Sequence, residues 1–481
     1  MNKWFLAQSE VRLTMLILII LIAMFVASAD VSLPLGADTL SSQQQFAHDV
    51  YKELLEINTV TATGDTGRAA DAMAARLRAA GFPESDVHVF KPAPGKGNLV
   101  AILSGTGARR PILLVAHLDV VEARREDWSF DPFKLIEQNG YYYARGSSDD
   151  KFMAATFVSN LIRYKQEGYR PDRDIKMVLE TDEEILDRYA VGMQWVIRNH
   201  RDLIDAEFAL NEGGGVSTRN GKALRNNIQI SEKVPCDFSL EVTNPGGHSS
   251  VPSKDNAIYH LAGGLVRLSQ FDFPVKLNDT TRSWFRQGAA FEEKQAGADM
   301  LSVASANPDP AAIARLSAKP AYNAELRTTC VATLLAGGHA DNALPQRAQA
   351  TVNCRVLPGE SIDDVQKALT RVVDDKQIAV KPTWIHDQSP PSPLSPEVFG
   401  AIKQVTAQMW PGIPVIPAMS TGATDGSFLR NVGILTYGTS GVAMEVDDIH
   451  AHGQDERVSL KSFYDGQEYL YRLVKLLAGG K

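Results

Sequence analysis

Short apolar segments alternate with segments of helical periodicity through the first half of the chain. Residues 97–105, 111–121 and 206–214 are rich in aliphatic side chains and are bounded by glycine or proline, which is typical of strands. Residues 150–168 carry apolar side chains at spacings of three and four, which predicts a helix. Strands that are apolar on both faces and separated by helices indicate a buried, mostly parallel sheet. We therefore predict an α/β fold for this part of the chain.

The pattern changes near residue 228. Residues 228–244 and 348–359 alternate apolar and polar side chains, which predicts an antiparallel sheet with one face in solvent. Residues 361–375 form an amphipathic helical pattern that begins at a capping serine. The Pro- and Ser-rich residues 387–396 are typical of a linker, and the α/β pattern returns after them.

These changes predict two domains, one inserted into the other. The α/β domain has a mostly parallel central sheet flanked by helices, and it consists of residues 30–228 and 389–481. A smaller α+β domain, residues 229–388, interrupts it. Within the insert, residues 277–320 are rich in Ala, Asp and Pro and predict either a helical or a loop insertion.

The N-terminus has the pattern of an export signal. Lys3 and Arg12 precede the uncharged apolar residues 13–26, and the small residues Ala27–Ala29 follow. We predict a signal peptide over residues 1–29, which directs the protein to the periplasm or outside the cell. The apolar stretch is shorter than the roughly 20 residues of a membrane span. An uncleaved N-terminal anchor is the alternative.

The composition limits the function classes. The chain has 481 residues, 44% hydrophobic and 22% charged, as expected of a folded protein with more than one domain. The net charge is -8, and Lys and Arg are dispersed without a basic patch. We therefore predict no nucleic-acid partner, and no membrane association beyond the N-terminal segment.

Three cysteines are too few for a disulfide framework. Cys330 and Cys354 lie on two predicted neighbouring strands, so they form the favoured pair if one disulfide exists. Three free thiols, including Cys236, are the alternative. The spacing contains no CxxC motif of a metal site.

Residues 180–187, ETDEEILD, hold five carboxylates directly after the apolar run 175–179. Acidic residues at such a place commonly form a solvated loop or the start of a helix. The other interpretation is a cation site, where a metal ion neutralises the charge. Glu180, Asp182 and Asp187 are the members that we expect to be solvent-facing or structural.

Other metal-ligating residue types also follow predicted strands or precede helices. In an open α/β sheet, loops at the carboxyl ends of the strands form the ligand site. Each residue alone has an ordinary interpretation, such as a hydrogen-bonded structural histidine or a helix cap. Together, two histidines and at least three carboxylates suit zinc or a related divalent ion. The candidates from which such a set would be drawn are His117, Asp119, Asp149, Asp150, Glu183, Glu184, Glu212, His450 and His452.

The segments around these residues resemble the M20 family of metallopeptidases and aminoacylases, from about residue 45 to the C-terminus. The motifs are LLVAHLDVV, ARGSSDDK, ETDEE, LNEGG, GGHSSVP, DNALP, VNCRVLPG and IHAHGQDER. DVVEARREDWSFDPF and NALPQRAQATVNCRVLPG are most similar to the branch of Gly-X carboxypeptidases and secreted N-acyl-amino-acid hydrolases. The resemblance implies a catalytic α/β domain interrupted by a dimerisation or lid domain.

The resemblance also implies two divalent metal ions. His117 and Glu212 would bind one ion, Glu184 and His452 would bind the other, and Asp149 would bridge both. Zinc is the default for this mixture of ligands, and manganese or cobalt would also suit it.

The family's catalytic roles fall on three further residues. Asp119 would orient His117, and Glu183 would act as the general base. His248, in the GGHSS motif of the inserted domain, would stabilise the oxyanion in the partner subunit's site. The resemblance therefore implies a homodimer.

Asn342 and Arg355 would hold the substrate, with Arg355 binding a carboxylate through its planar fork. We therefore expect a hydrolase that cleaves the amide bond to a C-terminal amino acid with a free carboxylate, as a carboxypeptidase or dipeptidase does. The alternative is an N-acyl-amino-acid hydrolase of the aminoacylase type. A more remote alternative is an exported binding protein without catalysis, which the intact Glu183 and the full ligand set oppose.

The sequence departs from the family pattern at three places. Residues 185–193, ILDRYAVGM, stand where relatives are Gly-rich, which affects substrate fit more than metal binding. Asp455 replaces a usual Asn, and Ala144–Gly146 read ARG where GRG is common. His452 is preferred over His450 as the ligand because the Gly and Glu after it match the family.

Overall fold

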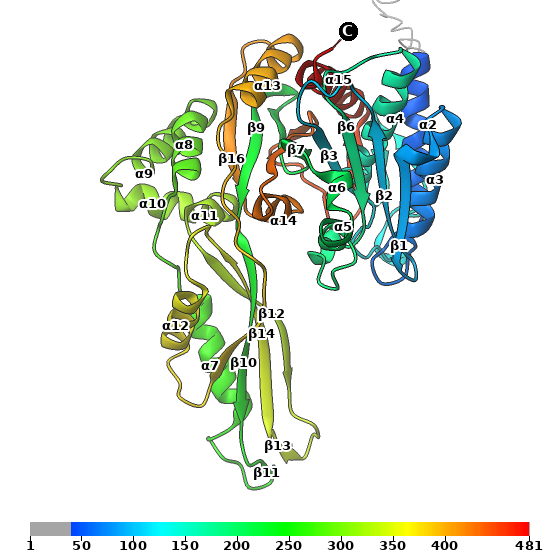
Figure 1. Cartoon of the computed structure of the whole chain (residues 1–481). Helices are drawn as coiled ribbons and strands as arrows, with labels where there is room; N and C mark the ends of the chain where they lie inside the picture. Colours follow the sequence, from blue (N-terminus) through cyan, green and yellow to red (C-terminus); the bar gives the residue numbers. More distant parts are fainter. Residues whose placement is uncertain (1–39, 481) are drawn as a thin grey trace, which may run out of the picture. The chain divides into compact units, whose positions relative to one another are not determined.

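The computed structural model describes residues 40–480 (Figure 1). The predicted signal peptide over residues 1–29 lies outside the described residues. The chain divides into two compact units, Met1–Gln45 and Phe46–Lys481, and the second contains the fold described below. Within residues 40–480, no helix is both long and apolar enough to cross a membrane.

A ten-stranded mixed sheet lies at the centre of the second unit. Its middle strands β6, β3, β7 and β17 run parallel to one another, whereas β1 and β2 pair antiparallel at one edge. The order is β1-β2-β6-β3-β7-β17-β9-β8-β18, with β16 beside β9. The strands are β1 (Val87–Ala93), β2 (Lys96–Leu103), β3 (Ile112–His117), β6 (Ile175–Glu180), β7 (Phe208–Asn211), β8 (Gly215–Arg219), β9 (Lys222–Glu232), β16 (Val415–Ser420), β17 (Leu435–Gly438) and β18 (Ala443–Glu445).

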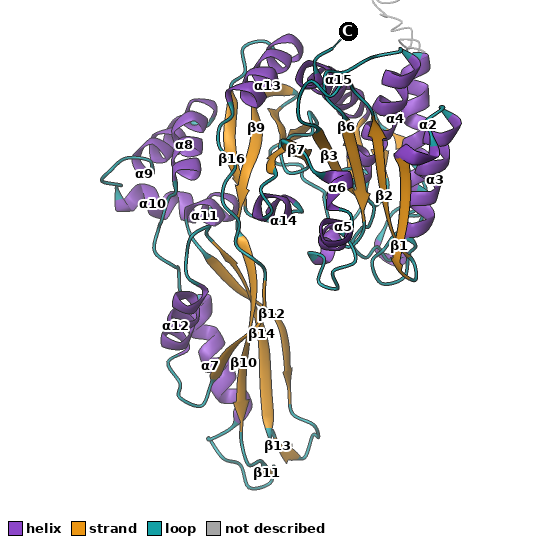
Figure 2. Cartoon of the chain, in the orientation of Figure 1, coloured by secondary structure: helices purple, strands orange, loops and turns teal. Residues whose placement is uncertain are grey.

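The middle strands are apolar along most of their length because they are buried. Every residue of β3 and of β6 is buried, because helices cover both faces of the sheet (Figure 2). Side chains alternate along β3, so Leu114 joins the core on one face and Leu113 the core on the other. This confirms the predicted α/β class. The covering helices are α2 (Ser42–Leu55), α3 (Thr66–Ala79), α4 (Lys151–Gln166), α13 (Pro396–Met409) and α15 (Leu460–Ala478) on the first face, and α5 (Met193–Asn199), α6 (Arg201–Ile204) and α14 (Gly426–Asn431) on the second.

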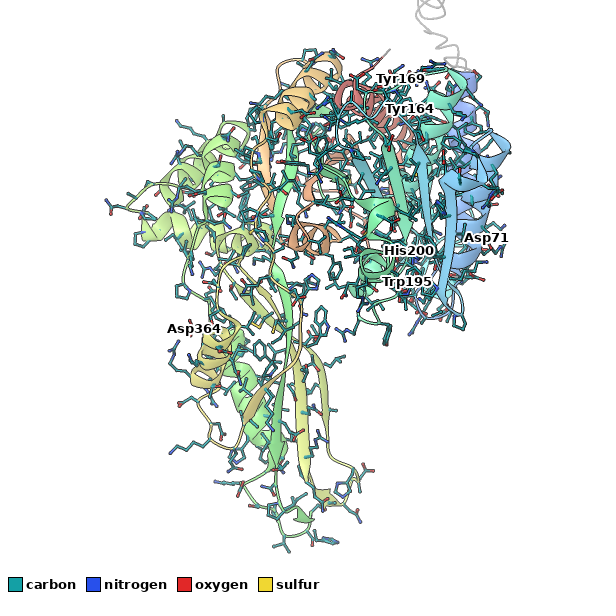
Figure 3. All side chains as sticks on the ribbon, viewed as in Figure 1. Asp71, Tyr164, Tyr169, Trp195, His200 and Asp364 are labelled. Carbon is teal, nitrogen blue, oxygen red and sulfur yellow. A yellow bond between two sulfur atoms is a disulfide. The ribbon has the colours of Figure 1, made fainter. Side chains whose placement is uncertain are left out.

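Aromatic contacts fix the second layer of helices to the edge of the sheet. The His200 ring stacks on Phe90 of β1 with a centroid distance of 3.8 Å, and Trp195 of α5 lies 5.6 Å from the same ring (Figure 3).

The inserted part contains a four-stranded antiparallel sheet in the order β12-β14-β10-β15. Burial alternates along β10 and β14, as their sequence pattern predicts, because α7 (Ala257–Ser269) and α12 (Ile362–Val373) cover one face. α12 begins at the predicted capping residue Ser361. The strands are β10 (Val234–Thr243), β12 (Thr329–Gly337), β14 (Arg347–Val356) and β15 (Ala379–Ile385).

Residues 277–320 are mostly helical, which decides between the two predicted alternatives. They contain α8 (Asp279–Gly288), α9 (Lys294–Val303) and α10 (Pro310–Ser317), and α11 (Pro320–Leu326) follows. These helices share a small core of their own that includes Phe285 and Met300. The predicted domain boundaries stay predictions, and residue 228 lies inside β9.

All three cysteines lie at one level of the inserted sheet. Cys330 of β12 pairs with Cys354 of β14, and Cys354 pairs on its other side with Cys236 of β10. A disulfide joins Cys330 to Cys354, which is the favoured pair from the sequence, and Cys236 is a buried free thiol.

Candidate metal centre

The topology of the central sheet brings the predicted ligands to one edge. His117 is the last residue of β3, Glu184 lies in the turn η3 (Glu183–Ile185) after β6, and Glu212 follows β7. Because these three strands are parallel neighbours, their carboxyl ends meet at the same edge. Asp149 lies just before α4, and His452 lies in the loop between β18 and β19 (Arg457–Ser459).

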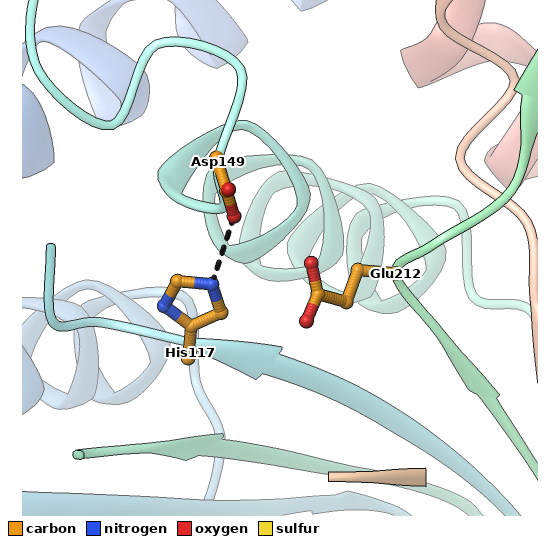
Figure 4. Close-up of side chains that lie close together, drawn as sticks. All are labelled: His117, Asp149 and Glu212. Carbon is orange, nitrogen blue, oxygen red and sulfur yellow. Dashed lines mark hydrogen bonds and ion pairs between the residues drawn. The ribbon is translucent and has the colours of Figure 1, made fainter. Parts of the chain in front are cut away.

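The five predicted ligands form two groups that share Asp149. His117, Asp149 and Glu212 make one group, and Asp149, Glu184 and His452 make the other. Within each group the ligand atoms lie within 4.8 Å of one another. Figure 4 shows the first group.

Each carboxylate oxygen of Asp149 faces a different imidazole. Oδ1 lies 3.1 Å from Nε2 of His117, and Oδ2 lies 3.1 Å from Nε2 of His452. Nε2 of His452 also lies 2.9 Å from Oε2 of Glu184. His450 instead pairs with Asp448 at 2.7 Å and belongs to neither group. This arrangement places Asp149 between the two candidate ligand groups.

The centre holds more carboxylates than imidazoles in a partly buried space. Burial opposes protonation of His117, but the hydrogen bond to Asp149 and the charges of Glu183 and Glu212 raise its pKa well above the usual value. Hydrogen bonds to Asp149 and Glu184 raise the pKa of His452 to about 10. Burial and neighbouring carboxylates raise the pKa of Glu183 and Glu212. Such a field attracts a divalent cation.

The donor set fits that cation. The buried Oε1 of Glu184 has no hydrogen-bond partner within the described residues, which leaves it free to bind a metal ion. Mixed imidazole and carboxylate ligands suit zinc and related divalent ions.

Asp119 acts on both sides of the centre. Nδ1 of His117 donates to the backbone carbonyl of Asp119 at 2.9 Å, whereas the carboxylate lies farther away, at 3.7 Å. The carboxylate instead accepts hydrogen bonds from the backbone N–H groups of Glu183 and Glu184, each at 3.2 Å. Burial raises the pKa of Asp119 to about 6. Asp119 therefore orients His117 through its backbone and holds the Glu183–Glu184 turn with its side chain, which the sequence spacing did not reveal.

The remaining acids of the ETDEEILD segment are buried and structural. Asp182 forms an ion pair with Lys96 at 2.6 Å. Asp187 accepts hydrogen bonds from the backbone N–H groups of Val191 and Gly192 at 2.7 and 2.8 Å, so it shapes the loop that follows the Glu183–Glu184 turn. Glu180 is fully buried at the end of β6.

The three predicted site residues of the inserted domain do not lie together. His248 and Asn342 are exposed neighbours, since Ser249 donates its N–H to the carbonyl of Asn342 at 3.0 Å. Arg355 lies near the other end of β14, which starts at Arg347. Arg355 is eight residues of extended strand from Arg347, a distance of about 27 Å.

Arg355 is half-buried, and its terminal nitrogens are free for a ligand. Its Nε donates to Asn353 at 3.3 Å, and within residues 40–480 no protein acceptor binds Nη1 or Nη2. Burial lowers its pKa, and the charges of Asp237 and Glu183 oppose that change. The Glu183 carboxylate is therefore among the charges that influence Arg355.

Comparison with known proteins identifies the family. The profile of peptidase family M20/M25/M40 matches residues 113–476. The chain belongs to this family. The prediction from the motifs is therefore confirmed, and the M20 protein is a metal-dependent hydrolase of the peptidase and amidohydrolase type.

Similar proteins include both kinds of hydrolase. The human N-fatty-acyl-amino acid synthase/hydrolase PM20D1 is 28% identical over 388 residues, which cover 79% of this chain and 76% of that protein. A probable carboxypeptidase S-like protein 2 from Dictyostelium discoideum is 28% identical, covering 76% of this chain and 71% of that protein. A metallo-carboxypeptidase of the M20 family from Sulfolobus solfataricus shares the fold, with a TM-score of 0.67 and 18% identity, over 91% of this chain and 100% of that chain.

Two further residues of the motifs have structural roles that the sequence did not assign. Asp455, at φ +51°, accepts hydrogen bonds from the N–H and hydroxyl of Ser129 at 2.9 and 2.7 Å. Glu456 is fully buried and accepts a hydrogen bond from the backbone N–H of Asp149 at 3.2 Å. Its place in the IHAHGQDER motif was the only indication of a role in the sequence.

Proposed function

We propose that this M20 protein is a dinuclear-metal hydrolase that cleaves the amide bond to a C-terminal amino acid with a free carboxylate. The observation that carries the proposal is the pair of ligand groups that share Asp149. In our assignment, His117 and Glu212 bind one ion, Glu184 and His452 bind the second, and Asp149 bridges them. When bound, the two ions would supply Lewis acidity at the scissile carbonyl and at the attacking water. Zinc is the proposed metal, with manganese and cobalt as alternatives.

Glu183 is the proposed general base. It belongs to neither ligand group, yet its carboxylate oxygen lies 3.9 Å from Nε2 of His117. The hydrogen bonds that the backbone N–H groups of Glu183 and Glu184 donate to Asp119 fix the turn, so one side chain is a ligand while the other faces the attacking water. A base in this position takes a proton from water and delivers it to the leaving amine.

Arg355 is the proposed partner of the substrate carboxylate. Its free Nη1 and Nη2 form a planar fork that binds both oxygens of a carboxylate. The interaction with Glu183 supports a position at the entrance to the metal centre. A substrate would then be held by its α-carboxylate while its amide carbonyl reaches the ions.

His248 and Asn342 act in the partner subunit's site in this proposal. β10 extends ten residues before the segment that carries His248, a length of about 33 Å. One chain therefore has Arg355 near its own metal centre and His248 far along the same sheet. A second copy supplies the missing groups, and His248 would donate to the oxyanion of the tetrahedral intermediate.

The proposed homodimer interface is the free edge of the inserted sheet. β12 is an edge strand, and its Val331, Leu334 and Leu335 are 60%, 67% and 71% exposed. Apolar side chains on an unpaired edge are a liability unless a partner covers them.

We also propose export to the periplasm or outside the cell. The signal pattern over residues 1–29 is the main support. The Cys330–Cys354 disulfide adds support, because disulfides persist in oxidising compartments.

An N-acyl-amino-acid hydrolase is the second candidate, favoured by the similarity to the human N-fatty-acyl-amino acid synthase/hydrolase. Both candidates use Arg355 in the same way and differ in the group on the other side of the amide. The test is a mass-spectrometric hydrolysis assay of the zinc-loaded protein with dipeptides and with the same amino acids carrying short or long acyl groups. Cleavage of dipeptides supports the first candidate, and cleavage of acylated amino acids alone supports the second. Hydrolysis of neither class would contradict the proposal, and Glu183→Gln serves as the inactive control.

A further inference from the structure

A buried ion pair joins the two chain segments that meet at the second ligand group. Nη1 of Arg145 lies 2.7 Å from Oε2 of Glu456, and the side chains are 3% and 0% exposed. Arg145 belongs to the segment that leads to Asp149, and Glu456 closes the segment that begins with His452. Neither residue is among the ligands proposed above.

The Glu456 carboxylate is saturated with hydrogen bonds from the Asp149 segment. Oε1 accepts from the backbone N–H of Ser148 at 2.7 Å, the Ser148 hydroxyl at 2.9 Å and the backbone N–H of Asp149 at 3.2 Å. Oε2 accepts from the N–H of Gly146 at 3.1 Å as well as from Arg145. Both oxygens therefore face donors only. A glutamine at this position would place its amide N–H groups against some of these donors.

Arg145 holds the His452 segment with its other terminal nitrogen. Nη2 donates to the carbonyls of Gly453 at 3.0 Å and His452 at 3.5 Å, while the guanidinium lies over the Trp128 ring at 5.0 Å. The fork of an arginine makes both connections at once, to Glu456 and to the His452 backbone, whereas a lysine offers a single nitrogen.

The two ligand groups depend on this pair to different degrees. His117 and Glu212 are fixed by the ends of β3 and β7 in the central sheet. His452 lies in a loop, in the left-handed backbone region at φ +61°, and the described structure anchors its carbonyl through Arg145. The separation of Asp149 from His452 is therefore set by the buried pair.

We propose that Arg145 and Glu456 are positioning residues for the second metal ion, the one assigned to Asp149, Glu184 and His452. This inference rests on the proposed two-metal site. Loss of the pair lets the His452 loop move away from Asp149. This weakens binding of the second ion and leaves binding of the first unchanged. Residues that orient ligands in this way change metal affinity by about 10- to 100-fold when they are replaced.

The test is a calorimetric zinc titration of the ion-free full-length protein, wild type beside Glu456→Gln and Arg145→Lys. A matched control is Glu232→Gln, because Glu232 is not a proposed ligand, forms an equally buried ion pair with Arg430 at 3.1 Å and accepts two hydrogen bonds from Thr424. We expect wild type and the control to bind two equivalents of zinc. Glu456→Gln should bind the first equivalent normally and the second at least about tenfold more weakly.

A thermal unfolding scan of each ion-free variant separates positioning from general destabilisation. The control should lose thermal stability without losing the second ion. Arg145→Lys is the milder change, and it provides the test if Glu456→Gln does not fold. Two normal equivalents in both Arg145→Lys and Glu456→Gln would overturn the positioning role. Equal loss of the second ion in the Glu232 control would also overturn it. A wild type that binds fewer than two ions would instead overturn the two-metal proposal itself.

Discussion

Nε2 of His452 lies 3.1 Å from Oδ2 of Asp149, although most of the chain separates the two residues in sequence. The other oxygen of Asp149 faces His117 at the same distance. One carboxylate therefore holds two imidazoles apart, at a spacing where a pair of cations can share it. Two metal ions in such sites lie roughly 3.5–4 Å apart.

Loading with zinc should release protons. Hydrogen bonds and nearby carboxylates raise the pKa of His117 well above its usual value and that of His452 to about 10, which favours the protonated form of both imidazoles without metal. Each must lose its proton to bind an ion, so apparent affinity falls as pH falls. Calorimetry in buffers of different ionisation enthalpy measures the release. His450→Gln should release as many protons as wild type, and a pH-independent affinity would argue against these ligands.

Glu183→Gln should reduce kcat by about 10²- to 10⁴-fold while both metal ions stay bound, because it removes the base and no ligand. The neighbouring Glu184→Gln, which changes a proposed ligand, should instead lose bound metal. Elemental analysis and initial rates on the same samples separate the two effects. Retained turnover in Glu183→Gln would exclude the base assignment.

Arg355→Met should lower kcat/KM for substrates with a free carboxylate by about 100-fold or more, since it removes charge-assisted hydrogen bonds. The loss should disappear when the same substrates are amidated at the C-terminus. Arg347→Met, at the exposed end of the same strand, is the matched control and should resemble wild type. An equal loss on carboxylate and amide substrates would show that Arg355 has another role.

Mixed dimers should test the role of His248. Glu183→Gln and His248→Ala should each be inactive alone, because each destroys one half of every composite site. After unfolding and refolding together in equal amounts, half of the dimers would carry one intact site, so about a quarter of wild-type activity should return. No recovery, with heterodimers demonstrated by native mass spectrometry, would place His248 outside the partner subunit's site.

The disulfide should join Cys330 to Cys354 and leave Cys236 free, although Cys236 lies at the same level on the other side of Cys354. Peptide mapping without reduction identifies the pair. Cys236 should react with an alkylating reagent only after unfolding, since it is fully buried. Closing a loop of 24 residues stabilises the folded state by roughly 3 kcal/mol, so reduction should lower the Tm. A Cys236–Cys354 link would contradict the Cys330–Cys354 disulfide, because the register places both cysteines opposite Cys354.

The sequence pattern alone predicted those strands and helices that depend mainly on their own residues. The apolar runs 111–121 and 175–179 became the buried strands β3 and β6, because a strand covered on both faces needs mostly apolar side chains. Residues 277–320 gave no such signal, since Ala- and Pro-rich sequence suits helices and loops alike. Their helical state depends on a shared core around Phe285 and Met300.

The sequence by itself determined the family, the α/β class and the residue types of the candidate site, because periodicity and motifs are properties of neighbouring residues. Only the tertiary structure decided which atoms meet. It directed the two oxygens of Asp149 to different histidines, and it used the Asp119 carboxylate to hold the Glu183–Glu184 turn. It also separated Asn342 from Arg355 by the length of β14. These relationships depend on strand order, register and loop anchoring between distant segments, which no local pattern encodes.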